Sequence, residues 1–241
     1  MPYRTLQLEK TQETLQRLVR RIEERFPDSS LGKVAKELHA ISLETESNVT
    51  WIALPNTALR LVVGLLIVVL FCVLILGFTA VDFGVGRFAM TEFIQALEAG
   101  INDLVLMGAA VFFLVSIESR MKRSRALTSL NELRTIAHVI DMHQLTKDPT
   151  ELSAEGKDTA SSPTRDMTPF ELNRYLDYCS ELLSLSSKLA SVYAEHFPDG
   201  TVVSAVNDIE ALTTGLSRKI WQKIFLVQSM QSRLDRPSDT G

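Results

Sequence analysis

The sequence has few of the residues that build stapled, metal-bound or common catalytic folds. Only two cysteines occur in 241 residues, Cys72 inside an apolar run and Cys179 in a distant polar segment, so a disulfide framework is excluded. The chain has no CxxC motif and no His/Cys cluster of the zinc-binding kind, and we expect neither a metal nor a cofactor. A phosphate loop, GxSxG, HExxH and a glycine-rich dinucleotide turn are also missing.

Two further absences bear on location and partners. The opening residues, MPYRTLQLEK, lack the apolar core of a cleavable signal peptide, so we expect the first apolar segment to direct membrane insertion. The formal net charge of -4 gives no sign of a nucleic-acid partner.

No segment alternates apolar and polar residues with period two, so we expect an all-α protein with essentially no β-structure.

The apolar residues are concentrated in two runs. Leu61–Val81 holds no charged residue and is long enough to cross ~30 Å of hydrocarbon as a helix. A buried core helix is the disfavoured alternative. Pro55, Asn56 and Thr57 supply a break and an N-cap before this run, and Trp51 lies where interfacial aromatic residues anchor helices.

The second run, Leu104–Ile117, is shorter, and length alone also allows a core helix or a re-entrant segment. Its flanks 100–102 and Ser119 can extend it, and Glu118 can pair with Lys122 one turn later at the water interface. We therefore expect two transmembrane helices, at about 59–81 and 101–119, that form an integral membrane hairpin over 58–120.

Lys and Arg are distributed unequally around the two runs. Nine precede the first run and five follow the second closely, whereas the connection 82–103 holds only Arg87. Because Lys and Arg near membrane ends stay cytoplasmic, we expect both termini on the cytoplasmic side of the plasma (inner) membrane. The sequon at Asn48, Val49 and Thr50 would then never meet the glycosylation enzyme.

The connection has a pattern of its own. Residues 82–86 read as a turn, and the following segment has a polar face over 92–103. This face either lines a pore or vestibule, or belongs to an amphipathic helix that lies at the outer surface before the chain turns inward. We favour the second interpretation.

The flanks predict helices that pack into a cytoplasmic bundle. Residues 1–57 read as a helical hairpin that turns at Pro27–Ser30, 121–146 as a juxtamembrane helix that Asp148 and Pro149 stop, and 147–167 as a flexible linker. Residues 168–241 read as a second hairpin with a short tail. It starts with a capping box at 168–171, and helices 169–196 and 202–234 pair antiparallel. We expect four core residues there: Leu182, Leu189, Leu212 and Leu216.

Three stretches carry a resemblance. LNELRTIAHVIDMHQLTKDP and LTTGLSRKIWQKI, with WIALPNTALRLVVGLLI at the entry to the first run, resemble blocks of a family of uncharacterised bacterial two-transmembrane-helix proteins. The resemblance implies a bacterial inner-membrane protein and no activity. Bacterial defence effectors with two membrane helices share the architecture only.

One polar constellation lies in an otherwise apolar helix. Arg134, His138 and Asp141 fall within about 60° of arc on one face, and a buried stripe of this kind needs partners. Either Asp141 orients His138 as a proton acceptor or pH sensor, or the three bond to one another and to the N-terminal hairpin. We favour the structural role. His143 lies about 140° from His138, too far round the helix to share a metal ion.

Two classes of function remain. We favour a non-enzymatic scaffold, sensor or effector whose cytoplasmic helices bind a protein partner or self-associate, with an oligomeric channel as a variant. The alternative is a membrane-bound enzyme with a site around His138, Asp141 and His143. Self-association is expected through Gly108, Ala109 and Ala110, small residues in the second span, unless these only pack the two spans of one chain together.

Overall fold

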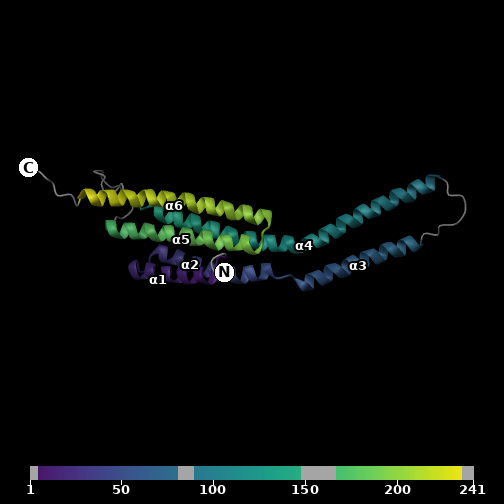
Figure 1. Cartoon of the computed structure of the whole chain (residues 1–241), viewed down its shortest axis with the longest axis horizontal. Coiled ribbons are helices and arrows are strands. Elements are labelled where there is room, and N and C mark those ends of the chain that lie inside the picture. Colours follow the sequence, from purple (N-terminus) through teal and green to yellow (C-terminus); the bar gives the residue numbers. More distant parts are fainter. Residues whose placement is uncertain (1–4, 81–89, 148–166, 235–241) are drawn as a thin grey trace, which may run out of the picture. The chain divides into compact units, whose positions relative to one another are not determined.

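The computed structural model describes residues 5–80, 90–147 and 167–234, and every regular element in them is a helix (Figure 1). The all-α prediction is therefore confirmed for this part of the chain. The turn predicted at 82–86 and most of the linker predicted at 147–167 lie outside the described residues. The helices are α1 (Leu8–Arg25), α2 (Ser30–Ala53), α3 (Thr57–Ala80), α4 (Met90–Leu145), α5 (Pro169–His196) and α6 (Gly200–Leu234).

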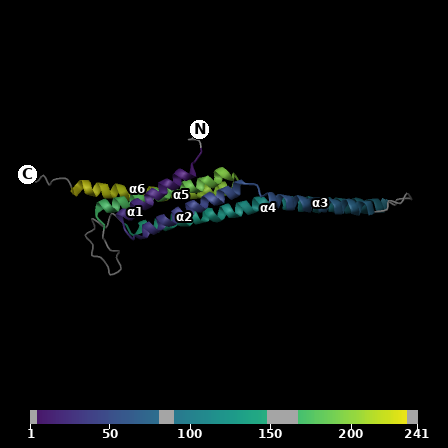
Figure 2. The same cartoon turned by 90° about the horizontal axis from the view of Figure 1, so that it is seen from below.

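These helices belong to two compact units, each described here by itself. The first unit combines residues 1–53 with 125–241, so it joins the two ends of the sequence, and the second comprises 54–124. Helix α4 is continuous through both units. Figure 2 gives a second view of the same helices.

Helices α5 and α6 form the most extensive helix pair of the first unit, and α1 packs on both α2 and α5. Only residues 197–199 separate α5 from α6, and a connection this short returns the second helix alongside the first in the opposite direction. Asp199 begins α6 by accepting the Thr201 backbone N–H at 3.0 Å. The antiparallel pairing predicted for this hairpin is what Figure 1 shows for α5 and α6.

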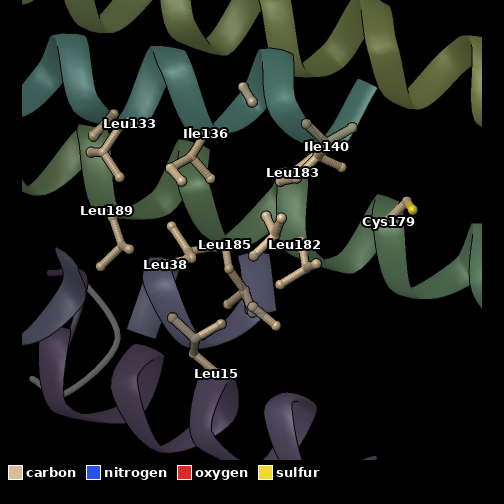
Figure 3. Packing of buried hydrophobic residues seen from close by; sticks show 14 of the residues in the cluster. Leu15, Leu38, Leu133, Ile136, Ile140, Cys179, Leu182, Leu183, Leu185 and Leu189 are labelled. Carbon is tan, nitrogen blue, oxygen red and sulfur yellow. The ribbon is translucent and has the colours of Figure 1, made fainter. Parts of the chain in front are cut away.

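The core of the first unit is built from the apolar faces of α1, α2, α4, α5 and α6, and Figure 3 shows part of it. Leu182 and Leu189 are completely buried and Leu216 is nearly so, as predicted. Leu212 is only half-buried and packs at the margin of the core. Leu15 of α1, Leu38 of α2 and Leu133 of α4 are also completely buried, so both ends of the sequence contribute to one core.

Capping residues explain where three helices begin. The Thr168 hydroxyl accepts the Glu171 N–H at 3.2 Å while the Glu171 carboxylate accepts the Thr168 N–H at 2.8 Å, which is the predicted capping box. These bonds hold the pKa of Glu171 below its usual value. Ser29 accepts the Gly32 N–H at 3.1 Å at the start of α2, and Asn56 accepts the Leu59 N–H at 3.1 Å at the start of α3.

Helix α4 differs from one expectation. It runs for 56 residues without interruption, so the predicted juxtamembrane helix does continue directly from the second apolar run. However, residues 92–103 are part of the same helix, and the structure has no turn between them and the apolar run. The favoured interpretation, an amphipathic helix that lies on the outer surface before turning inward, does not match this geometry.

Candidate functional site

The candidate residues Arg134 and His138 point to solvent. Both are exposed on α4, whereas Leu133, Ile136, Ala137 and Ile140 of the same helix are buried. Water can hydrogen-bond to exposed polar side chains, so Arg134 and His138 do not need the protein partners that a buried stripe would need. The sequence pattern identified the polar face correctly but placed it in the interior, whereas the structure has it facing solvent. Met142, which the prediction counted among the apolar residues around the stripe, is also exposed.

Asp141 and His143 have local partners instead of one another. The Asp141 carboxylate accepts the Gln144 side-chain amide at 2.7 Å, and His143 Nδ1 lies 2.8 Å from the Val139 carbonyl of its own helix. The four candidates therefore do not converge. Among the described residues, no group of three His, Cys, Asp or Glu side chains could hold a metal ion.

The polar residues that do converge lie in the second unit, around Glu118. The Arg60 Nε donates to this carboxylate at 2.7 Å, Lys122 Nζ lies 3.0 Å from it, and the Asn56 backbone N–H donates at 3.1 Å. Lys122 Nζ also donates to the Leu54 carbonyl at 2.8 Å. We call Leu54, Asn56, Arg60, Glu118 and Lys122 the Glu118 cluster.

Local sequence places each member of the cluster. Pro55 separates α2 from α3, which leaves the Leu54 carbonyl and the Asn56 N–H without helical partners. Lys122 and Glu118, one turn apart on α4, satisfy these two groups. The side chains of Glu118 and Lys122 are only 15% and 11% exposed, whereas that of Arg60 is 62% exposed, so the carboxylate is the shielded centre.

Above the cluster, α3 and α4 each have one shielded stripe. On α3 the half-buried positions recur every three or four residues, at Leu59, Val63, Ile67 and Leu70. On α4 the shielded positions in the same unit include Met107, Ala110, Leu114 and Ile117. Both spacings mark one helix face.

A second polar group fixes α4 to α2 in the first unit. Arg125 Nε donates to the Asn48 side-chain oxygen at 2.8 Å, and the Asn48 amide donates to Ser129 Oγ at 3.0 Å. The Arg125 guanidinium also stacks 4.7 Å from the Trp51 ring centroid. The side-chain oxygen and nitrogen of Asn48, the first residue of the sequon, are therefore both hydrogen-bonded within the fold.

The C-terminal end of α4 is held by α6. Lys223 Nζ donates to the Gln144 carbonyl at 2.8 Å and to the Lys147 carbonyl at 3.3 Å. A cation at this position satisfies carbonyls that have no helical partner and complements the negative end of the helix dipole. Sequence reasoning missed this contact and the Arg125–Asn48 contact, since nothing in helical periodicity pairs residues about 80 positions apart.

The Arg60–Glu118 contact was also missed, although its signal was present. Arg60 is the charged residue directly before the first apolar run, and Glu118 is the charged residue directly after the second. Two antiparallel helices bring these ends to the same level. Chemically, the cluster holds helices together: its carboxylate is already surrounded by cations and N–H groups, an arrangement that stabilises the charged form and leaves it a poor proton acceptor.

The described residues also line shallow grooves on α5 and α6, which include Lys188, Arg218 and Trp221 but none of the four candidates on α4. Comparisons with known proteins add no identity. No family model matches the chain, no curated protein matches it, and no solved structure matches it.

Proposed function

We propose that this chain is a two-span membrane protein of the plasma (inner) membrane whose helical first unit is a non-enzymatic association module. The single observation that carries the membrane assignment is the exposure of large apolar side chains along α3 and α4. Leu61, Leu65 and Leu76 of α3 and Leu104 and Phe112 of α4 are each at least 65% exposed. By length and composition, two helices could cross a membrane.

Water is a poor environment for such a surface, because each large apolar side chain left exposed forgoes about 1.5–3 kcal/mol of burial. Contiguous apolar surface on this scale marks a membrane or protein interaction site. In a bilayer, hydrocarbon surrounds both helices and covers their exposed apolar side chains on every side. It also accounts for the Glu118 cluster, since the charged groups gather beyond one end of each apolar run, where the interface begins.

The orientation follows from the basic residues. Arg60, Lys122 and Arg125 all lie at this end, and Lys and Arg near spans are retained in the cytoplasm. The guanidinium of Arg120 lies 5.3 Å from the Phe113 ring centroid, as expected for a long side chain that covers apolar surface while its charge stays at the interface. In this topology both termini are cytoplasmic, and the resemblance to bacterial inner-membrane proteins agrees with it.

The association role rests on the first unit. Its helices bury their apolar faces against one another, and exposed apolar side chains remain on α6, at Trp221 and Phe225. These two residues are one turn apart and share a helix face, the kind of surface on which a cytoplasmic protein docks. The enzyme alternative has less support, because His138, Asp141 and His143 neither converge nor line the described grooves.

Two measurements test this proposal. Membranes from expressing cells are washed with alkaline carbonate, which removes peripheral proteins, and the chain should stay in the pellet until detergent is added. The detergent-extracted protein is then sized and used to capture native partners. Release by carbonate would contradict the membrane assignment, whereas a monomer that retains no partner would contradict the association role.

A further inference from the structure

The basic residues that follow the apolar part of α4 differ in what surrounds them. Four of six consecutive positions are basic: Arg120, Lys122, Arg123 and Arg125. Lys122 Nζ lies 3.0 Å from the Glu118 carboxylate, and Arg125 donates to the Asn48 side chain. Arg120, by contrast, is exposed and makes no ion pair with any residue that the structure describes. Its charge is therefore available to a partner outside this chain.

The guanidinium of Arg120 turns back along α4 toward the apolar run. It lies 5.3 Å from the ring centroid of Phe113, seven residues earlier, and seven residues return an α-helix to within about 20° of the same face. Leu106 lies another seven residues earlier. Phe113 and Leu106 are 53% and 68% exposed. We call Leu106, Phe113 and Arg120 the Arg120 stripe, an exposed apolar surface that ends in a cation.

Neither α3 nor this part of α4 places an acidic side chain on the same face. Over 104–131, Glu118 is the only acidic residue, and it lies about 160° round the helix from Arg120. The only charged residue of α3 is Arg60, which is itself basic. Arg123, one turn after Arg120 and about 60° from it, adds a second cation beside the stripe. The end of the stripe is therefore positively charged and complements an anion.

We propose that the Arg120 stripe binds a phospholipid with an anionic headgroup, with the phosphate at Arg120 and an acyl chain along Phe113 and Leu106. A phospholipid is charged at one end and apolar along the rest, and the stripe has the same division in the same order. Clusters of about four to eight Lys and Arg directly beside a span attract anionic lipids. Phe113 lies about 10 Å along the helix from Arg120, which is within one leaflet of a hydrocarbon layer ~30 Å thick.

This inference rests on the proposed membrane location and adds the class of lipid that the chain retains. The full chain in detergent is titrated with phosphatidylglycerol, whose headgroup is anionic, or with phosphatidylcholine, whose headgroup has no net charge, and native mass spectrometry counts the bound lipid. The first phosphatidylglycerol should bind more tightly than the first phosphatidylcholine. Arg120→Gln should weaken phosphatidylglycerol binding by roughly five-fold, the effect of one basic residue near an anionic surface, and should leave phosphatidylcholine binding unchanged.

Arg20→Gln is the matched control for this titration. Arg20 is exposed on α1 and makes no ion pair with any described residue, so its replacement removes the same charge far along the sequence from the stripe. It should leave both affinities unchanged, and circular dichroism checks that both variants stay folded. Equal weakening in Arg120→Gln and Arg20→Gln, or no weakening in Arg120→Gln, would overturn the stripe as the site.

Free glycerol phosphate supplies the phosphate group without acyl chains. An excess should not displace phosphatidylglycerol from the wild-type chain, and displacement would overturn the lipid as the occupant. Carbonate washing keeps the two proposals apart. A carbonate-resistant chain that shows no preference for phosphatidylglycerol overturns the lipid site alone, whereas a chain that carbonate releases overturns the membrane location on which the lipid site depends.

Discussion

Arg60 and Glu118 are 58 residues apart in the sequence, yet the Nε of Arg60 lies 2.7 Å from the carboxylate of Glu118. The contact joins the first turn of α3 to the end of the apolar part of α4. Lys122 and the Asn56 N–H contact the same carboxylate, so one acidic side chain holds three separate groups. Glu118 therefore ties the start of α3 to α4.

Replacing Glu118 should therefore weaken the second unit. Glu118→Gln keeps the shape but removes the charge that two cations share, and hydrogen bonds to a charged, shielded group contribute about 1.5–3 kcal/mol. The free energy of unfolding, measured in detergent by titration with denaturing detergent, should fall by about that amount. Arg60→Lys should have a smaller effect, since Lys122 still neutralises the carboxylate.

Glu98→Gln is the matched control for this prediction, because Glu98 is an exposed carboxylate on the same helix and makes no ion pair with any residue that the structure describes. It should leave stability unchanged. Equal stability of Glu118→Gln and Glu98→Gln would show that the cluster does not hold α3 to α4.

Leucines in the α5–α6 pair should be sensitive to truncation. Leu182→Ala and Leu189→Ala each remove a completely buried side chain, and such changes cost roughly 2–5 kcal/mol through lost burial and the cavity that remains. Leu212→Ala should cost less because Leu212 is half-buried. Leu43→Ala, on an exposed residue of α2, should be nearly neutral. Wild-type thermal stability of the Leu189 variant would contradict the observed packing.

Cys179 should be unreactive in the folded protein. Burial raises the pKa of its thiol to about 12, against an ordinary value of 9.0, so at about pH 8 almost no thiolate is present, and thiolate is the reactive form. A water-soluble thiol reagent should label Cys179 in a Cys72→Ala variant only after denaturation. Rapid labelling of the folded protein would contradict the burial of α5 against its neighbours.

The same pKa difference has a consequence for stability. The unfolded chain ionises Cys179 at lower pH than the folded chain, so the contribution of the neutral thiol is fully present below about pH 9 and is lost as the pH rises toward 12. Burial also raises the pKa of Tyr175, which acts in the same direction. The free energy of unfolding should fall between about pH 9 and pH 12, and less steeply in Cys179→Ala.

His138→Ala tests the polar face of α4. Because His138 is exposed and makes no hydrogen bond with any described residue, the substitution should change the free energy of unfolding by less than about 0.5 kcal/mol. Asp141→Asn should cost somewhat more, since the Asp141 carboxylate accepts from the buried Gln144. Loss of partner binding or activity in a fully folded His138→Ala protein would identify this face as the functional site and would support the enzyme alternative.

The sequence predicts much of this fold because local signals decide it. Thr168 with Glu171, Ser29 before α2 and Asn56 before α3 cap their helices within four residues, and the Glu118–Lys122 pair is one turn long. Burial of Leu182 and Leu189 follows from helical periodicity. Each of these depends on residues close together in the chain, where spacing alone fixes the geometry.

Contacts between distant helices were not predictable in the same way. Two examples are the contact of Lys223 in α6 with the end of α4 and the contact of Arg125 with Asn48. Both depend on how two helices are rotated and shifted against each other, and helical periodicity does not determine this. The same limit explains why Arg134 and His138 were expected to be buried. When a helix has apolar residues on most sides, its sequence does not show which face packs against the core. The uninterrupted course of α4 through 92–103 was missed because a polar face was interpreted as the end of the span.

Topology is the measurement that tests the two-span account most directly. A reporter that is active only outside the cytoplasmic membrane is fused to the N-terminus, inserted after Arg87, or fused to the C-terminus. The account predicts activity for the insertion after Arg87 alone, because both termini remain in the cytoplasm. Strong activity of the C-terminal fusion would mean that the apolar part of α4 does not cross the membrane, and it would contradict the account.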